Sequence, residues 1–223
     1  MNERYERNIG AITEAEQAIL KTKKVVVIGC GGLGCYSAEF LTRLGIGFIT
    51  LIDGDSFAVS NLNRQLNSLE NNLGQNKADE TKKRLLQIDS SLKAKTFNLL
   101  LDEQNANELL KGFDIIIDAL DNAKTRLLIE KTANTLGIPI VHGAVEQWSA
   151  QVCTVFPGDF TLSKLYRSGT DTKKPSVLSF TPAFCATVQA AEVVKVLLDK
   201  KDILRKKLFT ADLKNNSFRI IEL

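Results

Sequence analysis

Residues 23–34, KKVVVIGCGGLG, decide the fold of this 223-residue chain. The apolar, β-branched run that ends at Gly29 is typical of a buried parallel strand. Beyond it, apolar residues recur with helical spacing from Leu33 to Leu44, and Gly45 supplies a stop. Glycines between a strand and a helix let backbone N–H groups approach a phosphate closely. The stretch therefore predicts a nucleotide-binding unit of an α/β fold.

Strands and helices alternate along the first two thirds of the chain. This order predicts a Rossmann-like, doubly wound, mostly parallel sheet with right-handed crossovers. The predicted strands cover residues 23–29, 48–53, 93–98, 113–120 and 138–144, and the helices cover 33–44, 77–88, 103–111 and 123–136.

The pattern changes after Gly143. Residues 147–158 look like an extended, antiparallel continuation of the sheet, and residues 158–180 read as a long loop of the kind that is often functional. An apolar helix is expected from Pro182 to about residue 198, followed by a hairpin over 207–223.

We treat the chain as one domain with three parts. A short helix opened by a capping box at Thr13–Glu16 belongs to residues 1–22. The nucleotide-binding core covers 23–144. We expect the antiparallel strands, the loop, the last helix and the hairpin of 145–223 to bind a partner.

Composition excludes several classes of protein. Hydrophobic residues make up 44% and charged residues 25%, which is typical of soluble globular proteins. A net charge of +3 is too small to favour nucleic acid or a membrane surface, and no membrane span or signal peptide is predicted. Four scattered cysteines without a C-x-x-C pair suggest free thiols, so we expect a cytoplasmic protein.

Polar residues near the glycine loop bear on which nucleotide binds. Asp53 ends the second predicted strand, where an acidic group can bind ribose hydroxyls. Arg64 and Lys77 follow closely, and Asp121 ends the fourth strand. A hydride-transfer site has no need of several cations, whereas ATP needs its triphosphate neutralised and a carboxylate for Mg²⁺. The set favours ATP and Mg²⁺, with an NAD-dependent Rossmann oxidoreductase as the alternative.

Seven motifs in one order link the chain to a known superfamily. They are R-Y-x-R at 4–7, G-x-G-G-L-G at 29–34, D-G-D at 53–55, S-N-L-N-R-Q at 60–65, Lys77, D-x-x-D-N at 118–122 and G-A-x-x-x-x-x-x-Q at 143–151. With them the chain resembles the ThiF/MoeB/HesA superfamily, bacterial relatives of the ubiquitin-activating enzymes.

The resemblance implies an ATP-dependent adenylyltransferase. Such an enzyme activates the C-terminal Gly-Gly carboxylate of a small ubiquitin-like sulfur-carrier protein and releases pyrophosphate. Molybdopterin, tungstopterin and thiamin synthesis are pathways of this type. One relative instead activates a carboxylate on a tRNA nucleoside, which remains an alternative, as does a non-catalytic nucleotide-binding module.

The resemblance also implies which residues act. Asp121 would hold Mg²⁺ near the reacting carboxylate, and Arg7 would reach across a homodimer interface to the partner's ATP. The implied catalytic set is Arg7, Arg64, Lys77 and Asp121. The implied ATP-binding set is Gly29, Gly31, Gly32, Leu33, Gly34, Asp53, Asp55, Asn61, Arg64, Gln65, Lys77, Asp121 and Asn122.

The chain departs from many of these relatives in its cysteines. Two C-x-x-C pairs hold a structural zinc in those relatives, but residues 161–167 have no cysteine and the sequence ends at Leu223 before a second pair, so we expect no zinc. Cys153 and Cys185 lie among apolar residues, which predicts buried, unreactive thiols. His142, the only histidine, is expected to be a structural residue.

Overall fold

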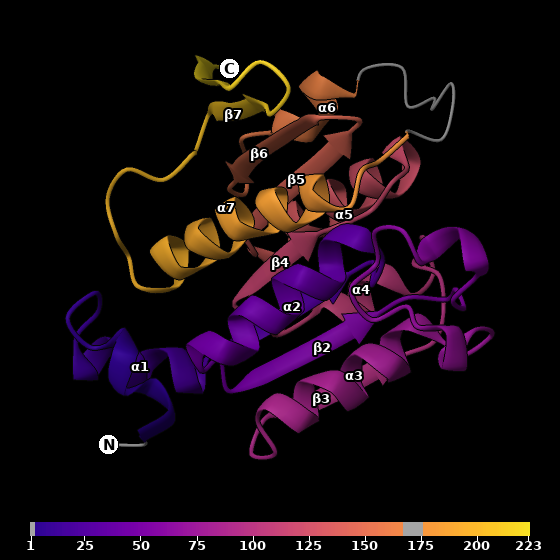
Figure 1. Cartoon of the computed structure of the whole chain (residues 1–223). Coiled ribbons are helices and arrows are strands. Elements are labelled where there is room, and N and C mark those ends of the chain that lie inside the picture. Colours follow the sequence, from indigo (N-terminus) through magenta and orange to yellow (C-terminus); the bar gives the residue numbers. More distant parts are fainter. Residues whose placement is uncertain (1–2, 167–175) are drawn as a thin grey trace.

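A computed structural model describes residues 3–166 and 176–223 of the chain. One sheet of eight strands runs through this described part (Figure 1), in the order β3-β2-β1-β4-β5-β6-β7-β8. The first five strands of that order are parallel, and the rest are antiparallel. The strands are β1 (Lys24–Ile28), β2 (Phe48–Ile52), β3 (Lys93–Phe97), β4 (Ile115–Asp118), β5 (Ile140–Glu146), β6 (Ser149–Val155), β7 (Lys207–Asp212) and β8 (Ser217–Glu222).

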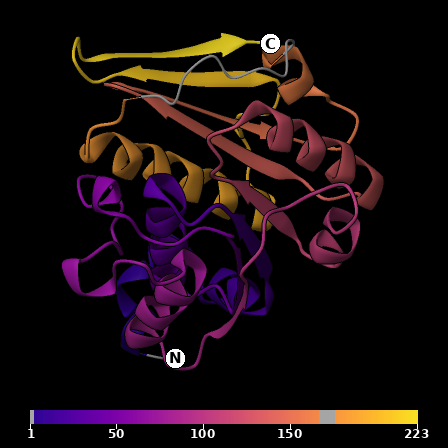
Figure 2. The ribbon, with the colours of Figure 1, turned by 90° about the vertical axis from the view of Figure 1, so that its right-hand side faces the viewer.

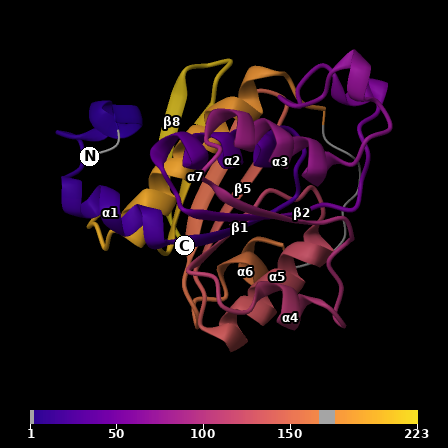
Figure 3. The same ribbon diagram turned by 90° about the horizontal axis from the view of Figure 1, so that it is seen from below.

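Helices cover both faces of the sheet. Figure 3 shows α2, α3 and α7 on one face and α4, α5 and α6 on the other, while Figure 2 shows the β7–β8 hairpin along one edge. The helices are α1 (Glu14–Thr22), α2 (Gly32–Leu44), α3 (Lys77–Ile88), α4 (Ala106–Leu110), α5 (Ala123–Leu136), α6 (Thr161–Leu165) and α7 (Phe180–Leu197), with short 3₁₀ helices η1 (Glu3–Asn8), η2 (Val59–Asn61) and η3 (Glu70–Asn72).

Strand β1 shows why the sheet needs two layers of helices. Val25 and Val27 pack into the core beneath α2 and α7, while Val26 and Ile28 pack into the core on the opposite face. Successive side chains of a strand point to opposite faces, so an unbroken apolar run requires cover on both. The predicted doubly wound sheet with antiparallel C-terminal strands is confirmed.

Local signals placed several helices correctly. Helices α3 and α5 cover the predicted residues. The capping box before α1 is confirmed, since Glu16 N donates to Thr13 Oγ1 and Thr13 N donates to Glu16 Oε2. Helix α4 is shorter than predicted.

The prediction of one loop over 158–180 is wrong in part. Residues 161–165 form α6, because the buried carboxylate of Glu130 accepts hydrogen bonds from Leu162 N and Ser163 N. Helix α7 begins at Phe180, so Pro182 lies in its first turn, where a missing N–H costs little. Residues 167–175 of the predicted loop lie outside the described residues.

Helix α7 meets the length and hydropathy criteria for a membrane span, although no membrane span is predicted from the sequence. Half of that stretch is buried inside the fold. Cys185, Ala186 and Val193 of α7 belong to the core shared with α2 and the sheet. We therefore interpret α7 as a core helix.

The glycine loop turns tightly at the end of β1. Gly29 has φ +91°, and a Cβ there would lie 2.7 Å from the carbonyl oxygen of Ala119, just after β4. A Cβ on Gly34 would lie 1.8 Å from Gly29 O. The absence of a side chain at both positions allows α2 to begin directly beside the end of β4.

Gly34→Ala should therefore destabilise the fold. The added methyl group must displace backbone, so we expect the free energy of unfolding to fall by at least about 2 kcal/mol, as in overpacked cores. Urea unfolding measures the change. Gly31→Ala is the matched control, because its Cβ would stand 3.5 Å from Gln65 Nε2 and should cost less. Equal losses in the two variants would contradict this account.

Candidate functional site

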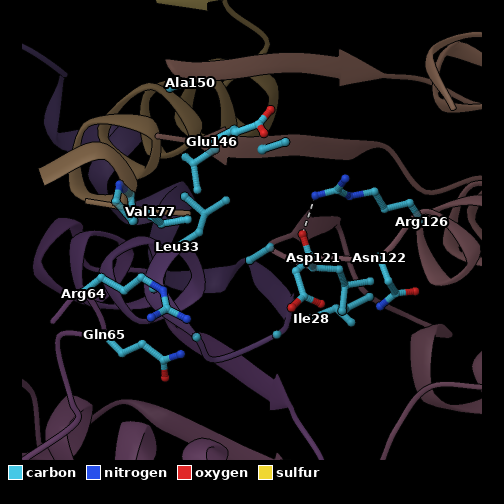
Figure 4. Close-up of a pocket in the computed structure, with 18 of the residues that line it drawn as sticks. Ile28, Leu33, Arg64, Gln65, Asp121, Asn122, Arg126, Glu146, Ala150 and Val177 are labelled. Atoms are coloured by element: carbon cyan, nitrogen blue, oxygen red, sulfur yellow. Dashed lines mark hydrogen bonds between the residues drawn. The ribbon is translucent and has the colours of Figure 1, made fainter. Parts of the chain in front are cut away.

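A pocket of about 1130 Å³ lies at the carboxyl ends of the parallel strands. In doubly wound folds this edge is where ligands bind, and the volume is ample for a nucleotide. Most of the residues expected to bind ATP line it: Gly29, Gly31, Gly32, Leu33, Asp53, Asp55, Asn61, Arg64, Gln65, Lys77, Asp121 and Asn122. Figure 4 shows Arg64 and Gln65 on one side of the pocket and Asp121 and Asn122 on the other. Gly34 does not line it and serves packing instead.

Asp53 joins the glycine loop to the chain that follows β2. Its Oδ2 accepts a hydrogen bond from Cys30 N at 2.6 Å, and its Oδ1 accepts one from Asp55 N at 2.8 Å. Burial raises the pKa of Asp53 above its ordinary value. A carboxylate has about four acceptor sites, so these two bonds leave capacity for ribose hydroxyls.

Lys77 enters the pocket from the first turn of α3. Asn76 caps this helix by accepting from Ala78 N and Asp79 N, which fixes where α3 starts. The Lys77 side chain is largely buried, with Nζ 3.0 Å from Asp55 Oδ2. A lysine held beside a single exposed carboxylate remains able to meet a phosphate chain.

Arg64 and its neighbours line the side of the pocket that faces Asp121 and Asn122. Its guanidinium donates to Ser60 O and to Asn63 Oδ1, each at 2.8 Å. Asn61 Oδ1 accepts from Ala58 N and so holds the start of η2. Gln65 Oε1 is buried and has no hydrogen-bond partner within the described ranges. An orphaned acceptor beside the glycine loop suits a ligand that carries hydroxyl or amino donors.

Asp121 follows β4 and presents an exposed carboxylate to the pocket. Asn122 caps α5, since its Oδ1 accepts from Thr125 N at 2.9 Å. Residues 3–166 and 176–223 contain no group of three or more His, Cys, Asp or Glu able to hold a metal. Mg²⁺ bound with a nucleotide needs only one or two protein ligands, and Asp121 fits that requirement.

Arg7 lies outside the pocket. Buried Tyr5 anchors its 3₁₀ helix, η1, to the end of α3, because Tyr5 Oη donates to Asp89 Oδ2 at 2.6 Å. Lys77 lies at the other end of α3, and twelve helical residues span about 18 Å. Arg7 is therefore remote from the pocket of its own chain.

A buried polar cluster adjoins the pocket, and sequence reasoning assigned it no role at the site. Asp118 is fully buried, with Oδ2 at 2.7 Å from His142 Nδ1 and 3.7 Å from Arg126 Nε. Burial alone would raise the pKa of Asp118, but the hydrogen bond with His142 and the Arg126 charge hold it below its ordinary value. Burial lowers the pKa of His142. His142 is fully buried and hydrogen-bonded at both ring nitrogens, which agrees with the expectation of a structural residue.

Arg126 and Tyr166 were missed as pocket residues. Arg126 lies four residues after Asn122, hence on the same face of α5, and that spacing could have revealed it. The neighbouring sequence carries no signal for the position of Tyr166. Tyr166 follows α6, and α6 is capped by Glu130, which belongs to α5. The β7–β8 hairpin adds Thr210, Asp212, Ser217 and Arg219.

Comparison with known proteins agrees with the motifs. Residues 5–223 match the ThiF family. This chain belongs to the ThiF family. The predicted family is thereby confirmed.

Named relatives of this ThiF-family chain include enzymes. It is 30% identical to the SAMP-activating enzyme E1 of Haloferax volcanii, covering 98% of this chain and 84% of that protein. It is 33% identical to the molybdopterin-synthase adenylyltransferase of Haemophilus influenzae, covering 87% and 84%. For the adenylyltransferase and sulfurtransferase MOCS3 of Dictyostelium discoideum the identity is 31%, over 99% of this chain and 54% of MOCS3. The chain thus spans about half the length of MOCS3.

Solved structures share the fold. The crystal structure of E. coli MccB with ATP matches with a TM-score of 0.87 at 25% identity, over 100% of this chain and 72% of that one. The structure of PaaA matches with a TM-score of 0.83 at 25% identity, over 99% and 82%.

All four cysteines are buried and free, so the predicted burial of Cys153 and Cys185 is confirmed. Burial raises the pKa of Cys185 to about 12 and that of Cys35 to about 11. It also raises the pKa values of Cys30 and Cys153.

These thiols should resist alkylation in the native protein. At pH 8 a group of pKa about 12 is ionised in roughly one molecule in ten thousand, and the thiolate is the nucleophile. We expect negligible labelling by iodoacetamide over minutes in buffer and full labelling of all four cysteines in denaturant, measured by mass spectrometry. Rapid native labelling of Cys153 or Cys185 would show that the thiol is accessible.

Proposed function

We propose that this chain is an ATP-dependent adenylyltransferase that activates the C-terminal Gly-Gly carboxylate of a small ubiquitin-like sulfur-carrier protein. The observation that carries the proposal is one pocket in which Arg64, Lys77 and Asp121 surround the glycine loop. The names of the relatives, which include an E1 enzyme and adenylyltransferases, support it.

The reaction exchanges one bond to phosphorus for another. A carboxylate oxygen of the carrier bonds to the α-phosphorus of ATP, and the bond to the β,γ-pyrophosphate breaks, its electron pair leaving with pyrophosphate. The product is an acyl-adenylate. Positioning and neutralisation of charge are the main demands on the protein.

The pocket residues divide this work. Asp53 orients the ribose, and the loop amides beside Gly31 and Gly32 receive phosphate oxygens. Lys77 and Arg64 neutralise the phosphate chain as charge moves to the leaving pyrophosphate. Asp121 would hold Mg²⁺, which when bound supplies further positive charge at the phosphates.

The cations also argue against the oxidoreductase alternative. A dinucleotide site needs a glycine loop and a ribose-binding acid, both of which are present, but it does not need Lys77 and Arg64 facing one pocket. The family match favours adenylation as well.

We also propose that the active form is a homodimer. Arg7 sits at the far end of α3 from Lys77, so it can serve a pocket only in a second copy of the chain. Two-fold dimers, in which each copy supplies the same residue to the other, are the commonest oligomers.

Within each copy, we assign residues 23–144 to the nucleotide and residues 145–223 to the carrier. The name of the Haemophilus influenzae relative favours a molybdopterin-type pathway over thiamin or tungstopterin synthesis. Activation of a tRNA nucleoside is the second candidate. A cytoplasmic location and the absence of zinc stay predictions.

Purified protein with Mg²⁺-ATP and its Gly-Gly carrier should catalyse exchange between ATP and labelled pyrophosphate. Asp121→Ala should lower the rate by at least about a hundredfold while the melting temperature stays close to that of the wild type, because the side chain is exposed. Exchange at the wild-type rate in this variant would remove Asp121 from the mechanism. Stimulation by tRNA rather than by any Gly-Gly protein would favour the second candidate.

Complementation tests the trans role of Arg7. Arg7→Ala and Asp121→Ala should each be inactive as homodimers, yet a mixed dimer retains one site with both residues intact. Random one-to-one mixing should restore about a quarter of wild-type activity, since half of the dimers are mixed and each has one working site. Co-expression ensures subunit exchange. Activity that stays at the mutant level after proven exchange would place Arg7 in its own chain or outside the mechanism.

A further inference from the structure

We propose that Arg126 binds the carboxylate of the acyl substrate and that Asp118, His142 and Tyr166 position its guanidinium. The inference rests on the adenylation function proposed above. It assigns an acyl-carboxylate subsite to a part of the pocket that the phosphate-binding residues leave open.

Arg126 enters the pocket from the side opposite Arg64 and Gln65 (Figure 4), next to Asp121. Lys77 and Arg64, by contrast, belong to the wall formed by the chain after β2. Glu146 and Ala150, from strands β5 and β6, lie above Arg126 in the same view. The guanidinium therefore faces the part of the pocket that β5 and β6 line, beyond the position proposed for Mg²⁺.

The hydrogen bonding of Arg126 is incomplete. The residue is 6% exposed, and its Nη2 donates to Leu120 O. Its Nε is buried and, among the residues that the structure describes, has no hydrogen-bond partner. A guanidinium carries five N–H donors in a planar fork that matches a carboxylate, and a buried donor without a partner is costly. Because Nε lies toward Asp118, an incoming carboxylate would meet the terminal nitrogens of the guanidinium.

Three side chains hold the guanidinium in place. Asp118 Oδ2 accepts from His142 Nδ1 at 2.7 Å, and that leaves His142 Nε2 to accept from Tyr166 Oη at 3.0 Å. Tyr166 Oη in turn accepts from Gln151 Nε2 at 3.0 Å. Asp118, His142, Tyr166 and Gln151 are thus linked by one series of hydrogen bonds.

Arg126 lies between Asp118 and the ring of Tyr166. Its Nε is 3.7 Å from Asp118 Oδ2, and its Cζ is 4.8 Å from the centre of the Tyr166 ring. A carboxylate on one side and an aromatic face on the other restrict the guanidinium without consuming all its donors. Tyr166 and His142 are positioning residues, since they act through Arg126.

The test compares two forms of the carrier that supports exchange: the natural one, with a C-terminal carboxylate, and one whose last glycine is a carboxamide. Calorimetry measures the Kd of each form for the wild-type protein in the presence of a non-hydrolysable ATP analogue. Losing a charge-assisted bond costs about tenfold or more, so the carboxamide should bind at least about tenfold more weakly.

Two variants should erase that difference. Arg126→Lys keeps the charge but loses the planar fork, and Tyr166→Phe keeps the ring but releases His142 and Gln151. In both, the ratio of the two Kd values should fall below about threefold while the Kd of the ATP analogue stays unchanged. Thr154→Val is the control: it removes a buried hydroxyl of β6 that donates to Glu192, away from the pocket, and should lower stability while keeping the ratio.

The outcomes separate the two proposals. A tenfold ratio that persists in Arg126→Lys, or an equal loss of the ratio in Thr154→Val, would overturn the carboxylate subsite while leaving adenylation intact. So would a parallel loss of affinity for the ATP analogue. If the wild type neither binds any Gly-Gly protein nor catalyses exchange with one, the proposed function fails and the subsite fails with it.

Discussion

The contact between the glycine loop and the end of β4 is the constraint on which the site depends. Gly34 has room for no side chain against Gly29 O, and Gly29 has none against Ala119 O. This close approach brings the start of α2, the carboxylate of Asp53 and the turn that carries Asp121 to one edge of the sheet. A methyl group at either glycine would push apart the walls between which a nucleotide must fit.

Sequence patterns predicted those parts of the fold whose causes are local. Helix α3 starts at Lys77 because Asn76 caps it, and α5 ends where Gly137 adopts the left-handed conformation that glycine favours. Helix α6 was missed because its cap, Glu130, lies about thirty residues away in the chain. The same difference between local and long-range causes applies to the site. Its loop residues at strand ends were predictable from the sequence, whereas the position of Tyr166 depends on tertiary contacts.

Asp118, at the end of β4, is a charged residue that is fully buried in the core. A fully buried carboxylate is stable only when its charge is balanced and its oxygens are hydrogen-bonded, and here His142, Arg126 and the amide of Leu120 provide both. Replacement of one member leaves the others buried without partners, so the cluster holds the Asp118–Arg126 geometry within narrow limits.

The two halves of the sheet give the pocket two chemically different walls. The parallel half supplies the glycine loop, Asp53 and Lys77, which suit a nucleotide. The antiparallel half supplies side chains of β5, β6 and the hairpin, including Gln151 and Arg219. Arg126 comes from α5, which follows the parallel strand β4, and its guanidinium stacks over Tyr166, which follows α6. An in-line transfer requires the attacking group and the leaving pyrophosphate on opposite sides of the α-phosphate, and a pocket with cations on two opposed walls meets that requirement.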